Sequence, residues 1–471
     1  MEPLEDESGY WWLPQDPLRR YPGRLSFDEK DGARLELSIP IQEKAPSFTR
    51  ANEEYPLIHG VTSQGREVSL LNCYATSDRW PTAEIFTQSI FGHFAFDGFH
   101  LPSVETANIK CISATVPFLS SWLGSTGIDV KRSNDLKDFD ISYRQPPPFI
   151  AKITSSIQIK IFVRPAGIPI SGWPGAEVKI REELWLVLEP VAPQTYLQLL
   201  DSIQVVFDFF TFVCMDLCAP EDIQLEGDFN PRTLTNGATI YPHASLKYMP
   251  IYSPKKKRSP HPMDLLLKSS DLAEQIEPVL SSWLEHSQDL KSVRVLYLSA
   301  LYGEHPYIEN KFLSICQAAE VFHRCFRQGE YMDSARYENE VLPRLISQIP
   351  TDLSSDLIEV MQQRFEYLNE FSLGKRLKEL VAENKDIVLG LVPDIKDVLR
   401  AIVEARNQFT HFSGKPGRKD ISGERILYYV YVLRMIVDLS VLRQVGVPYE
   451  ILRKAAMQSE LYRRMFRMKQ Q

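Results

Sequence analysis

The sequence predicts an α+β multidomain protein in which an antiparallel β-rich, sandwich-like domain is followed by an all-α helical bundle. Three observations lead to this prediction. Within the first 190 residues, several segments alternate polar and apolar side chains with period two. From about residue 195 onward, the apolar period changes to three and four. The chain has 471 residues, which is too long for one ordinary core. We therefore expect a β-rich domain over residues 1–260 and a helical domain over residues 261–471.

The predicted strands are short, alternating segments separated by turn-forming residues. "GRLSF" and "ARLELSI" flank the turn-like "DEKDG", and the pattern recurs in "GREVSLLNC", "IKCISATVPFL", "SSIQIKIFV" and "EVKIREELWLVLEP". Gly and Pro clusters lie between them. Many short strands with such turns are typical of an antiparallel sandwich or jelly roll.

A helical segment is predicted near residues 195–216, packed against the β-rich domain. Its apolar residues recur at spacings of three and four: Leu197, Leu200, Ile203, Phe207, Phe210 and Val213. The apolar run "IQVVFDFFTFVCM" is too short for a membrane span and contains Asp208. The acidic N-terminus "MEPLEDESGYWW" lacks the features of a signal peptide. We therefore expect a cytoplasmic protein without membrane partners.

The remainder of the chain predicts a bundle of four or more helices. A linker containing "SPKKKRSPHP" marks the domain boundary. "NKFLSICQAAEVFHRCF" places Phe312, Ile315, Ala319, Phe322 and Phe326 on one side of a helix. "PDIKDVLRAIVEARNQFTHF" and "GERILYYVYVLRMIVDLSVLRQVG" are further helices. The second is apolar almost all round, which indicates more apolar surface than a single bundle covers and hence a homodimer.

Charge and cysteine content exclude several classes of protein. A net charge of −8 argues against a dedicated DNA-binding protein. From Arg443 to the end, however, the sequence contains seven basic residues and only two acidic ones. Any contact with nucleic acid is therefore expected to be local. The six cysteines form no CxxC pair, so no zinc site is expected. No Gly-rich phosphate loop is present to indicate an NTPase.

The segment "EARNQFTHFSG" (404–414) contains the polar residues that indicate a catalytic site. The apolar stripe of this helix comprises Ile395, Val398, Leu399, Ile402 and Phe409, and Arg406 lies on the same phase. A buried guanidinium needs a partner or an anion. Arg406 and His411 are separated by roughly 140° on an α-helix, so they meet only if the helix ends or bends between them. Asn407 and His411 share a face, which would let Asn407 orient the imidazole. The alternative is that Arg406 forms a salt bridge with a neighbouring helix while His411 only caps.

An arginine followed by a polar residue and a histidine at a helix end resembles the RX4-6H motif of the HEPN superfamily, over roughly residues 305–465. More closely, the chain resembles the ApeA-type anti-phage proteins, which carry a β-rich N-terminal domain and a C-terminal HEPN domain. The segments "WWLPQDPLRRYPGRLSF", "IHGVTSQGREVSLLNC" and "NKFLSICQAAEVFHRCF" carry this resemblance. The resemblance implies a metal-independent endoribonuclease that acts in abortive infection, without a cofactor. It also implies a homodimer or higher assembly in which two motifs face one cleft.

In such an enzyme the RNA 2′-hydroxyl attacks the adjacent phosphate, which leaves a 2′,3′-cyclic phosphate and a 5′-hydroxyl. His411 would move the proton and Arg406 would stabilise the phosphoryl charge. We consider Glu404 and Glu320 as carboxylates that orient these groups. The candidates for RNA contacts are Lys415, Arg418 and Lys419. Transfer RNA is the first substrate to test, and the N-terminal domain would sense a phage-derived trigger or restrain the nuclease.

Two other functions remain open from the sequence. In the first, the helical domain is a non-catalytic HEPN scaffold, and replacing His411 leaves activity intact. In the second, a carbohydrate- or peptide-binding β-sandwich carries a helical oligomerisation domain, and ligand binding occurs without loss of RNA.

Overall fold

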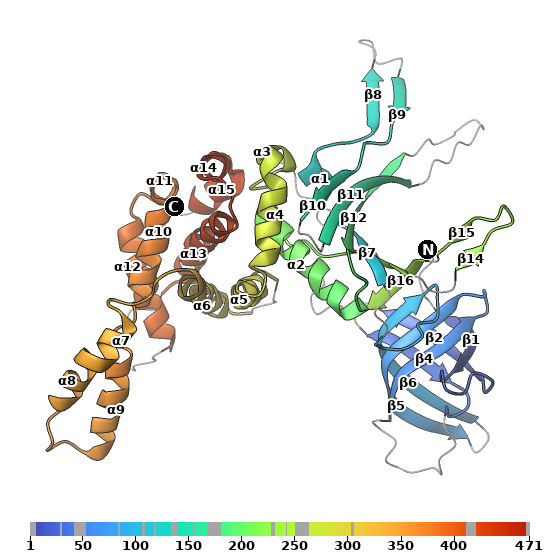
Figure 1. The fold of residues 1–471 in the computed structure, drawn as a ribbon, viewed down its shortest axis with the longest axis horizontal. Coiled ribbons are helices and arrows are strands. Elements are labelled where there is room, and N and C mark those ends of the chain that lie inside the picture. The colour runs from blue at the N-terminus through green and yellow to red at the C-terminus, as the bar shows by residue number, and fades with distance from the viewer. Residues whose placement is uncertain are drawn as a thin grey trace. The chain divides into compact units, whose positions relative to one another are not determined.

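The computed structural model describes residues 6–28, 31–41, 53–82, 85–105, 109–116, 119–132, 139–153, 157–166, 180–227, 231–241, 243–249, 263–302, 306–410 and 421–467. Two compact units divide the chain between them (Figure 1). The first comprises Met1–Phe207 and Cys218–Ser259, and the second comprises Asp208–Leu217 and Pro260–Gln471. The first is rich in strands and the second is helical, so the predicted α+β class is confirmed.

The first six strands of the β-rich unit form a closed antiparallel ring. They are β1 (Glu7–Trp12), β2 (Tyr21–Asp28), β3 (Gly32–Leu37), β4 (Glu54–Thr62), β5 (Glu67–Thr82) and β6 (Ile85–Asp97). Their order is β6-β3-β2-β1-β4-β5, and β5 also pairs with β6, which closes the ring. Buried side chains fill its interior, among them Trp11, Leu25, Leu35, Ile58 and Leu70.

An open part of the same sheet continues from β6. On one edge, β6 pairs with β3 through residues 88–92 and then with β16 through residues 94–97. From β16 the order runs β13-β7-β12-β11-β10. The bounds are β7 (Ile109–Thr115), β10 (Phe149–Lys152), β11 (Ile157–Ala166), β12 (Arg181–Pro190), β13 (Ile223–Gly227) and β16 (His243–Tyr248). Two small hairpins and a short helix complete the unit: β8 (Ile128–Arg132) with β9 (Phe139–Tyr143), β14 (Arg232–Thr233) with β15 (Thr239–Ile240), and α1 (Leu119–Leu123).

The closed ring differs from the sandwich-like arrangement that the sequence suggested. Both architectures alternate buried and exposed residues along each strand, so period-two patterning does not separate them. The long hairpin of β5 and β6 closes the ring, because β5 pairs with β4 on one edge and with β6 on the other. The antiparallel, β-rich character of the region is confirmed.

The helix α2 (Tyr196–Cys214) is divided between the two units, since the boundary falls between Phe207 and Asp208. In the β-rich unit, the Tyr196 ring lies 5.4 Å from the Phe94 ring and 5.3 Å from the Phe96 ring. Among the described helices, α2 alone is long and apolar enough to cross a membrane by length and composition. Two thirds of that window is buried inside the structure, as in the core helix of a globular protein.

The second half of α2 belongs to the core of the helical unit. The Phe209 ring lies 5.7 Å from the Trp283 ring. The Phe212 ring stacks on Tyr297 at 4.9 Å. Asp208 accepts a hydrogen bond of 2.6 Å from the buried Arg294. The helical segment expected near 195–216 therefore contributes core residues to both units.

The helical unit is built around α6, α12 and α13. Its elements are α3 (Ser269–Leu272), η1 (Ala273–Gln275), α4 (Ile276–Glu285), α5 (Lys291–Tyr302), α6 (Ile308–Phe326), α10 (Leu373–Glu383), α11 (Lys385–Leu391), α12 (Ile395–Thr410), α13 (Gly423–Gln444), α14 (Tyr449–Gln458) and α15 (Glu460–Arg467). The stripe predicted for α6 is confirmed at Phe312, Ile315, Ala319 and Phe322, which are fully buried.

The apolar surface of α13 is covered within its own unit. Most of its apolar residues between Ile426 and Leu442 are buried, and α13 contacts α6, α10, α14 and α15. The expectation that α13 leaves apolar surface uncovered was wrong, because the sequence does not reveal that neighbouring helices surround it. Its apolar character therefore gives no separate support for a homodimer.

A buried polar cluster lies on α13. Asp438 accepts hydrogen bonds from the hydroxyls of Tyr297 and Tyr462, the latter at 3.2 Å. The Nε of Arg434 lies 3.7 Å from the same carboxylate, and its Nη2 donates to the Met215 carbonyl at 2.6 Å. Burial raises the pKa of Asp438 to about 6, although Arg434 and the two hydroxyls oppose this rise. The cluster ties α13 to α5, α15 and the residues that follow α2.

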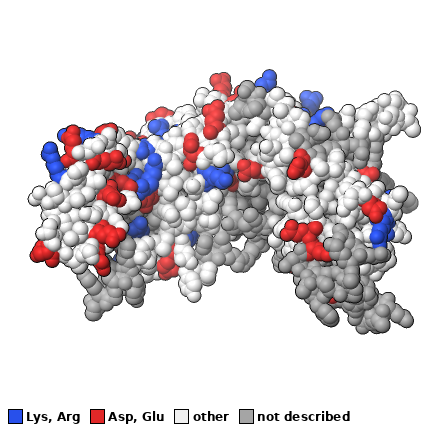
Figure 2. Space-filling view, turned by 60° about the horizontal axis from the view of Figure 1, so that its bottom comes forward, with Lys and Arg blue, Asp and Glu red and all other residues white. Residues whose placement is uncertain are grey.

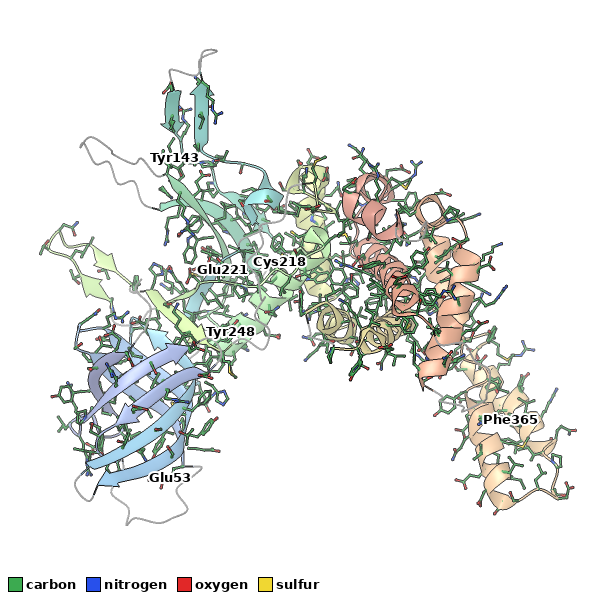
Figure 3. The ribbon with its side chains drawn as sticks, turned by 180° about the vertical axis from the view of Figure 1, so that it is seen from behind. Glu53, Tyr143, Cys218, Glu221, Tyr248 and Phe365 are labelled. Atoms are coloured by element: carbon green, nitrogen blue, oxygen red, sulfur yellow. The ribbon has the colours of Figure 1, made fainter. Side chains whose placement is uncertain are left out.

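A helical arm (residues 331–369) extends between α6 and α10. It contains α7 (Ser334–Arg336), η2 (Tyr337–Val341), α8 (Leu342–Ser347) and α9 (Ser355–Glu366), which carries Phe365 (Figure 3). The Tyr337 hydroxyl donates to the Phe365 carbonyl across the arm. At the arm's base, the Phe371 amide donates to the Gly329 carbonyl at 2.7 Å. The fully buried Arg376 donates to the carbonyls of both Phe371 and Gly329, so its guanidinium holds the two ends of the arm together.

Candidate functional site

Arg406 lies in the last described turn of α12. The predicted stripe is confirmed at Ile395, Val398, Leu399 and Ile402, which are buried together with Ala405, whereas Phe409 is half-buried. Arg406 is half-buried at the edge of this stripe. The Phe409 ring, also half-buried, packs 5.9 Å from the Phe312 ring on α6. This contact fixes the end of α12 against α6 and thereby sets the position of Arg406.

The guanidinium of Arg406 carries no ion pair with a carboxylate within the described part of the chain. Its recorded hydrogen bond goes from Nη1 to Oδ1 of Asn407, at 3.4 Å. The Thr410 hydroxyl donates to the Arg406 carbonyl at 2.9 Å and so supports the last described turn. A half-buried cation without a neutralising partner is a ready binding point for an anion.

Cys316 on α6 experiences the charges of both Arg406 and Glu320. Burial raises the pKa of the Cys316 thiol, the charge of Arg406 lowers it, and the charge of Glu320 raises it. Both charges therefore lie close to the same thiol. Glu320, however, pairs with Arg324 one turn further along α6, at 3.3 Å. The carboxylate that the sequence suggested as a partner for Arg406 is thus engaged elsewhere.

Glu404 and Asn407 are both exposed on α12. Burial raises the pKa of the Tyr429 hydroxyl, Arg425 lowers it, and Glu404 adds to the rise. Glu404 therefore lies near Tyr429 on α13. Asn407 contacts Arg406, so its side chain is directed at the cation of the motif.

The other candidates, His411, Lys415, Arg418 and Lys419, lie outside the described residues. The meeting of Arg406 with His411, and the roles of the three basic residues, therefore stay predictions. Within the described ranges, no group of three or more His, Cys, Asp or Glu side chains is placed to hold a metal ion.

A ladder of polar contacts joins α6 and α10, and the sequence-based prediction did not include it. Nε2 of the buried His323 lies 2.9 Å from Oε2 of Glu379. On the other side of the ring, Nδ1 of His323 lies 3.1 Å from Nη1 of Arg376. One turn along, Arg327 forms a bidentate pair with Glu383, at 2.5 and 2.8 Å. Both helices carry these groups at i and i+4, and that matched spacing is the sequence signal that identifies such a ladder.

His323 makes the stability of this region dependent on pH. Burial lowers the pKa of His323, although its hydrogen bond to Glu379 opposes this. Below about pH 6.5 the unfolded imidazole binds a proton while the folded one resists it, so stability falls as the pH decreases through this window. We expect the urea midpoint to fall more between about pH 7.5 and 5.5 in the wild type than in His323→Gln.

The matched control for this prediction is His286→Gln, because His286 contacts Ser282 on α4 and takes no part in the ladder. This variant should keep the pH dependence of the wild type. A pH dependence equal in wild type and His323→Gln would contradict the assignment.

Surface charge in the described residues is mixed. Figure 2 shows acidic side chains over both the helical and the β-rich parts, with Lys and Arg interspersed among them. On that face the described residues form no continuous basic stripe, in agreement with the net charge of −8. A nucleic-acid contact would depend on a few residues and not on a broad basic surface.

Two family models match the chain. Residues 6–283 match the family model of ApeA N-terminal domain 1, which covers more than half of the chain. Residues 313–451 match the model of the Apea-like HEPN domain, and this stretch includes α12 and Arg406. No curated protein and no solved structure matches the chain. HEPN domains are generally ribonucleases and commonly dimerise, so the match supports a nuclease. The chain belongs to the ApeA family of anti-phage proteins, with an N-terminal domain 1 followed by an Apea-like HEPN domain.

Proposed function

We propose that this protein is a metal-independent HEPN endoribonuclease that cleaves RNA in the cytoplasm during abortive infection. The observation that carries the proposal is Arg406: a half-buried guanidinium with no carboxylate partner in the described residues, at the end of α12 and inside the HEPN match. Such a cation is available to a phosphate. The alternative in which Arg406 serves only a structural salt bridge has no support among the described contacts.

RNA supplies its own nucleophile in this reaction. The 2′-hydroxyl attacks the adjacent phosphorus, and the bond to the 5′-oxygen of the next nucleotide breaks. His411 acts as general base or acid, because an imidazole titrates near neutral pH. Arg406 stabilises the charge that develops on the phosphoryl oxygens, and Asn407 holds the guanidinium in place. The products are a 2′,3′-cyclic phosphate and a 5′-hydroxyl, and DNA is spared because it lacks the 2′-hydroxyl.

Acid and base together require two imidazoles, so we propose a homodimer in which two copies of the motif face one cleft. Lys415, Arg418 and Lys419 would follow the RNA backbone beside it. Light scattering at micromolar concentration tests this assembly, and a strict monomer would refute it.

The β-rich unit is proposed to restrain the nuclease until a phage-derived trigger arrives. The test adds extract from phage-infected cells to the full-length protein, and an unchanged cleavage rate would count against restraint. A truncation at residue 260 is unsuitable, because it removes Asp208, Phe209 and Phe212 from the core of the helical unit.

The decisive experiment incubates total RNA with the full-length protein in excess EDTA, wild type beside His411→Ala. Sequencing that reads the chemistry of RNA ends then identifies the cut sites, with transfer RNA as the first species to inspect. Cleavage by the wild type alone, leaving cyclic phosphates, supports the proposal. If neither protein cleaves, even with infected-cell extract, the non-catalytic scaffold becomes the better interpretation.

A further inference from the structure

Glu320 lies within reach of two cations on different helices. Arg324, one turn along α6, contacts its Oε1 at 3.3 Å. The Phe409 ring at the end of α12 packs 5.9 Å from the Phe312 ring of α6, which sets Arg406, one turn back on α12, beside α6. The charges of Arg406 and Glu320 both act on the Cys316 thiol, one turn back from Glu320 on α6. A long arginine side chain near Cys316 is close enough to reach the carboxylate at the next turn. Two arginines therefore have access to one carboxylate.

The carboxylate is held by Arg324 and not by Arg406. Opposite charges that share a half-buried site attract strongly, so a free Glu320 would be expected to pair with Arg406. The Glu320 side chain is only 22% exposed, which reduces screening by solvent. Arg406 nevertheless has only its hydrogen bond to Asn407 among the described contacts. The bond of Glu320 to Arg324 accounts for this arrangement.

Arg324 also contacts the base of the helical arm, through the same nitrogen that contacts Glu320. Its Nη2 lies 2.7 Å from Oε2 of Glu370, the residue that follows the arm. Glu370 lies 3.6 Å from the buried Arg376, whose guanidinium joins the two ends of the arm. Arg324 thus bridges Glu370 at the arm base and Glu320 beside the candidate site.

We propose that Arg324 is a positioning residue for the cleavage reaction: it holds Glu320 away from Arg406 and so leaves the Arg406 guanidinium free for the scissile phosphate. This role rests on the ribonuclease function proposed above. It also couples the helical arm to the site, because a shift of Glu370 away from Arg324 would release Glu320 to neutralise Arg406.

The first test measures RNA cleavage by Arg324→Gln, Glu320→Gln and the double variant. Arg324→Gln should lower the rate about ten- to a hundredfold, because Glu320 then pairs with the cation that stabilises the transition state. The double variant should return to the rate of Glu320→Gln alone, because no carboxylate remains to neutralise Arg406. A double variant as slow as Arg324→Gln would overturn the proposal, as would a fully active Arg324→Gln.

Arg336→Gln is the matched control. Arg336 pairs with Glu340 at i and i+4, at 3.4 Å, with the same spacing as the Arg324 and Glu320 pair, but it lies on the arm. Its substitution removes an equivalent helix ion pair without touching Glu320. Loss of cleavage in Arg336→Gln equal to that in Arg324→Gln would show that the effect is general and would overturn the proposal.

A second measurement does not depend on cleavage. Urea midpoints are compared for Glu320→Gln, Arg406→Gln and their combination, once with Arg324 present and once in Arg324→Gln. We expect additive shifts with Arg324 present and non-additive shifts in Arg324→Gln, where Glu320 and Arg406 pair. Additive shifts in both would refute the proposal. Non-additivity in a protein that cuts no RNA would refute the ribonuclease function while the competition for Glu320 stands.

Discussion

Arg406→Ala lowers the rate of RNA cleavage by about 10² to 10³-fold, the usual cost of removing one transition-state hydrogen-bond donor. The loss falls on catalysis because the guanidinium is not used to hold the fold: it is half-buried and has no carboxylate partner among the described residues. The same variant should unfold at the urea concentration of the wild type or slightly above it, since removing an unneutralised half-buried cation costs the fold little. Initial cleavage rates and urea midpoints, measured on the same preparations, check both statements.

Arg400→Ala is the control for this prediction. Arg400 lies on the same helix, 73% exposed, and pairs with Asp397 at 3.5 Å. Its loss should leave both cleavage and stability near wild type. Arg406→Lys should recover only part of the rate, because an ammonium keeps the charge but not the bidentate geometry. An Arg406→Ala variant that cleaves at the wild-type rate would remove Arg406 from the mechanism.

Asp438→Ala should lower the free energy of unfolding of the helical unit by about 3 to 5 kcal/mol, the range observed when one partner of a buried ion pair is removed. Asp438 is 1% exposed and receives hydrogen bonds from Tyr297 and Tyr462. Its removal leaves two buried hydroxyls without their acceptor and Arg434 without its carboxylate. Circular dichroism at the helical band during urea titration measures this loss.

Asp438→Asn separates the two contributions to this loss. The amide oxygen still accepts from one tyrosine, but the charge opposite Arg434 is gone, so an intermediate destabilisation is expected. Asp397→Ala, which removes an exposed carboxylate from α12, should change the midpoint little. If Asp438→Ala unfolded at the wild-type midpoint, the buried cluster would contribute nothing to stability.

Local pattern in the sequence predicted the elements and the position of the candidate motif. The stripe through Ile395, Leu399 and Ile402 placed Arg406 at the edge of a buried face, and the structure has it there. Period-two alternation predicted antiparallel strands. These features depend on neighbours within one helical turn or one strand, which is the range over which side-chain spacing carries information.

Features that depend on distant pairing were beyond the sequence. The closed ring requires β5 to pair with two strands, and alternation is the same whether a sheet closes or stacks. Glu320 was a reasonable partner for Arg406, yet Arg324 pairs with it, and Arg324 is in turn held by Glu370, 46 residues further along the chain. Tertiary geometry determines which of two cations pairs with a carboxylate. The spacing of these residues in the sequence therefore does not predict the pair.

The shared helix α2 has a consequence for how the protein is made. The ribosome completes α2 before it synthesises β13 and β16, and it releases Trp283 and Tyr297 only later. Until those residues emerge, Phe209 lacks its contact with Trp283, and Phe212 lacks its contacts with Trp283 and Tyr297. The strands of the first unit up to β12 are already available to fold. The nascent chain therefore passes through a stage in which the second half of α2 is apolar but not yet packed against the rest of the helical unit. Chaperones that bind exposed apolar segments should therefore engage the chain during that interval.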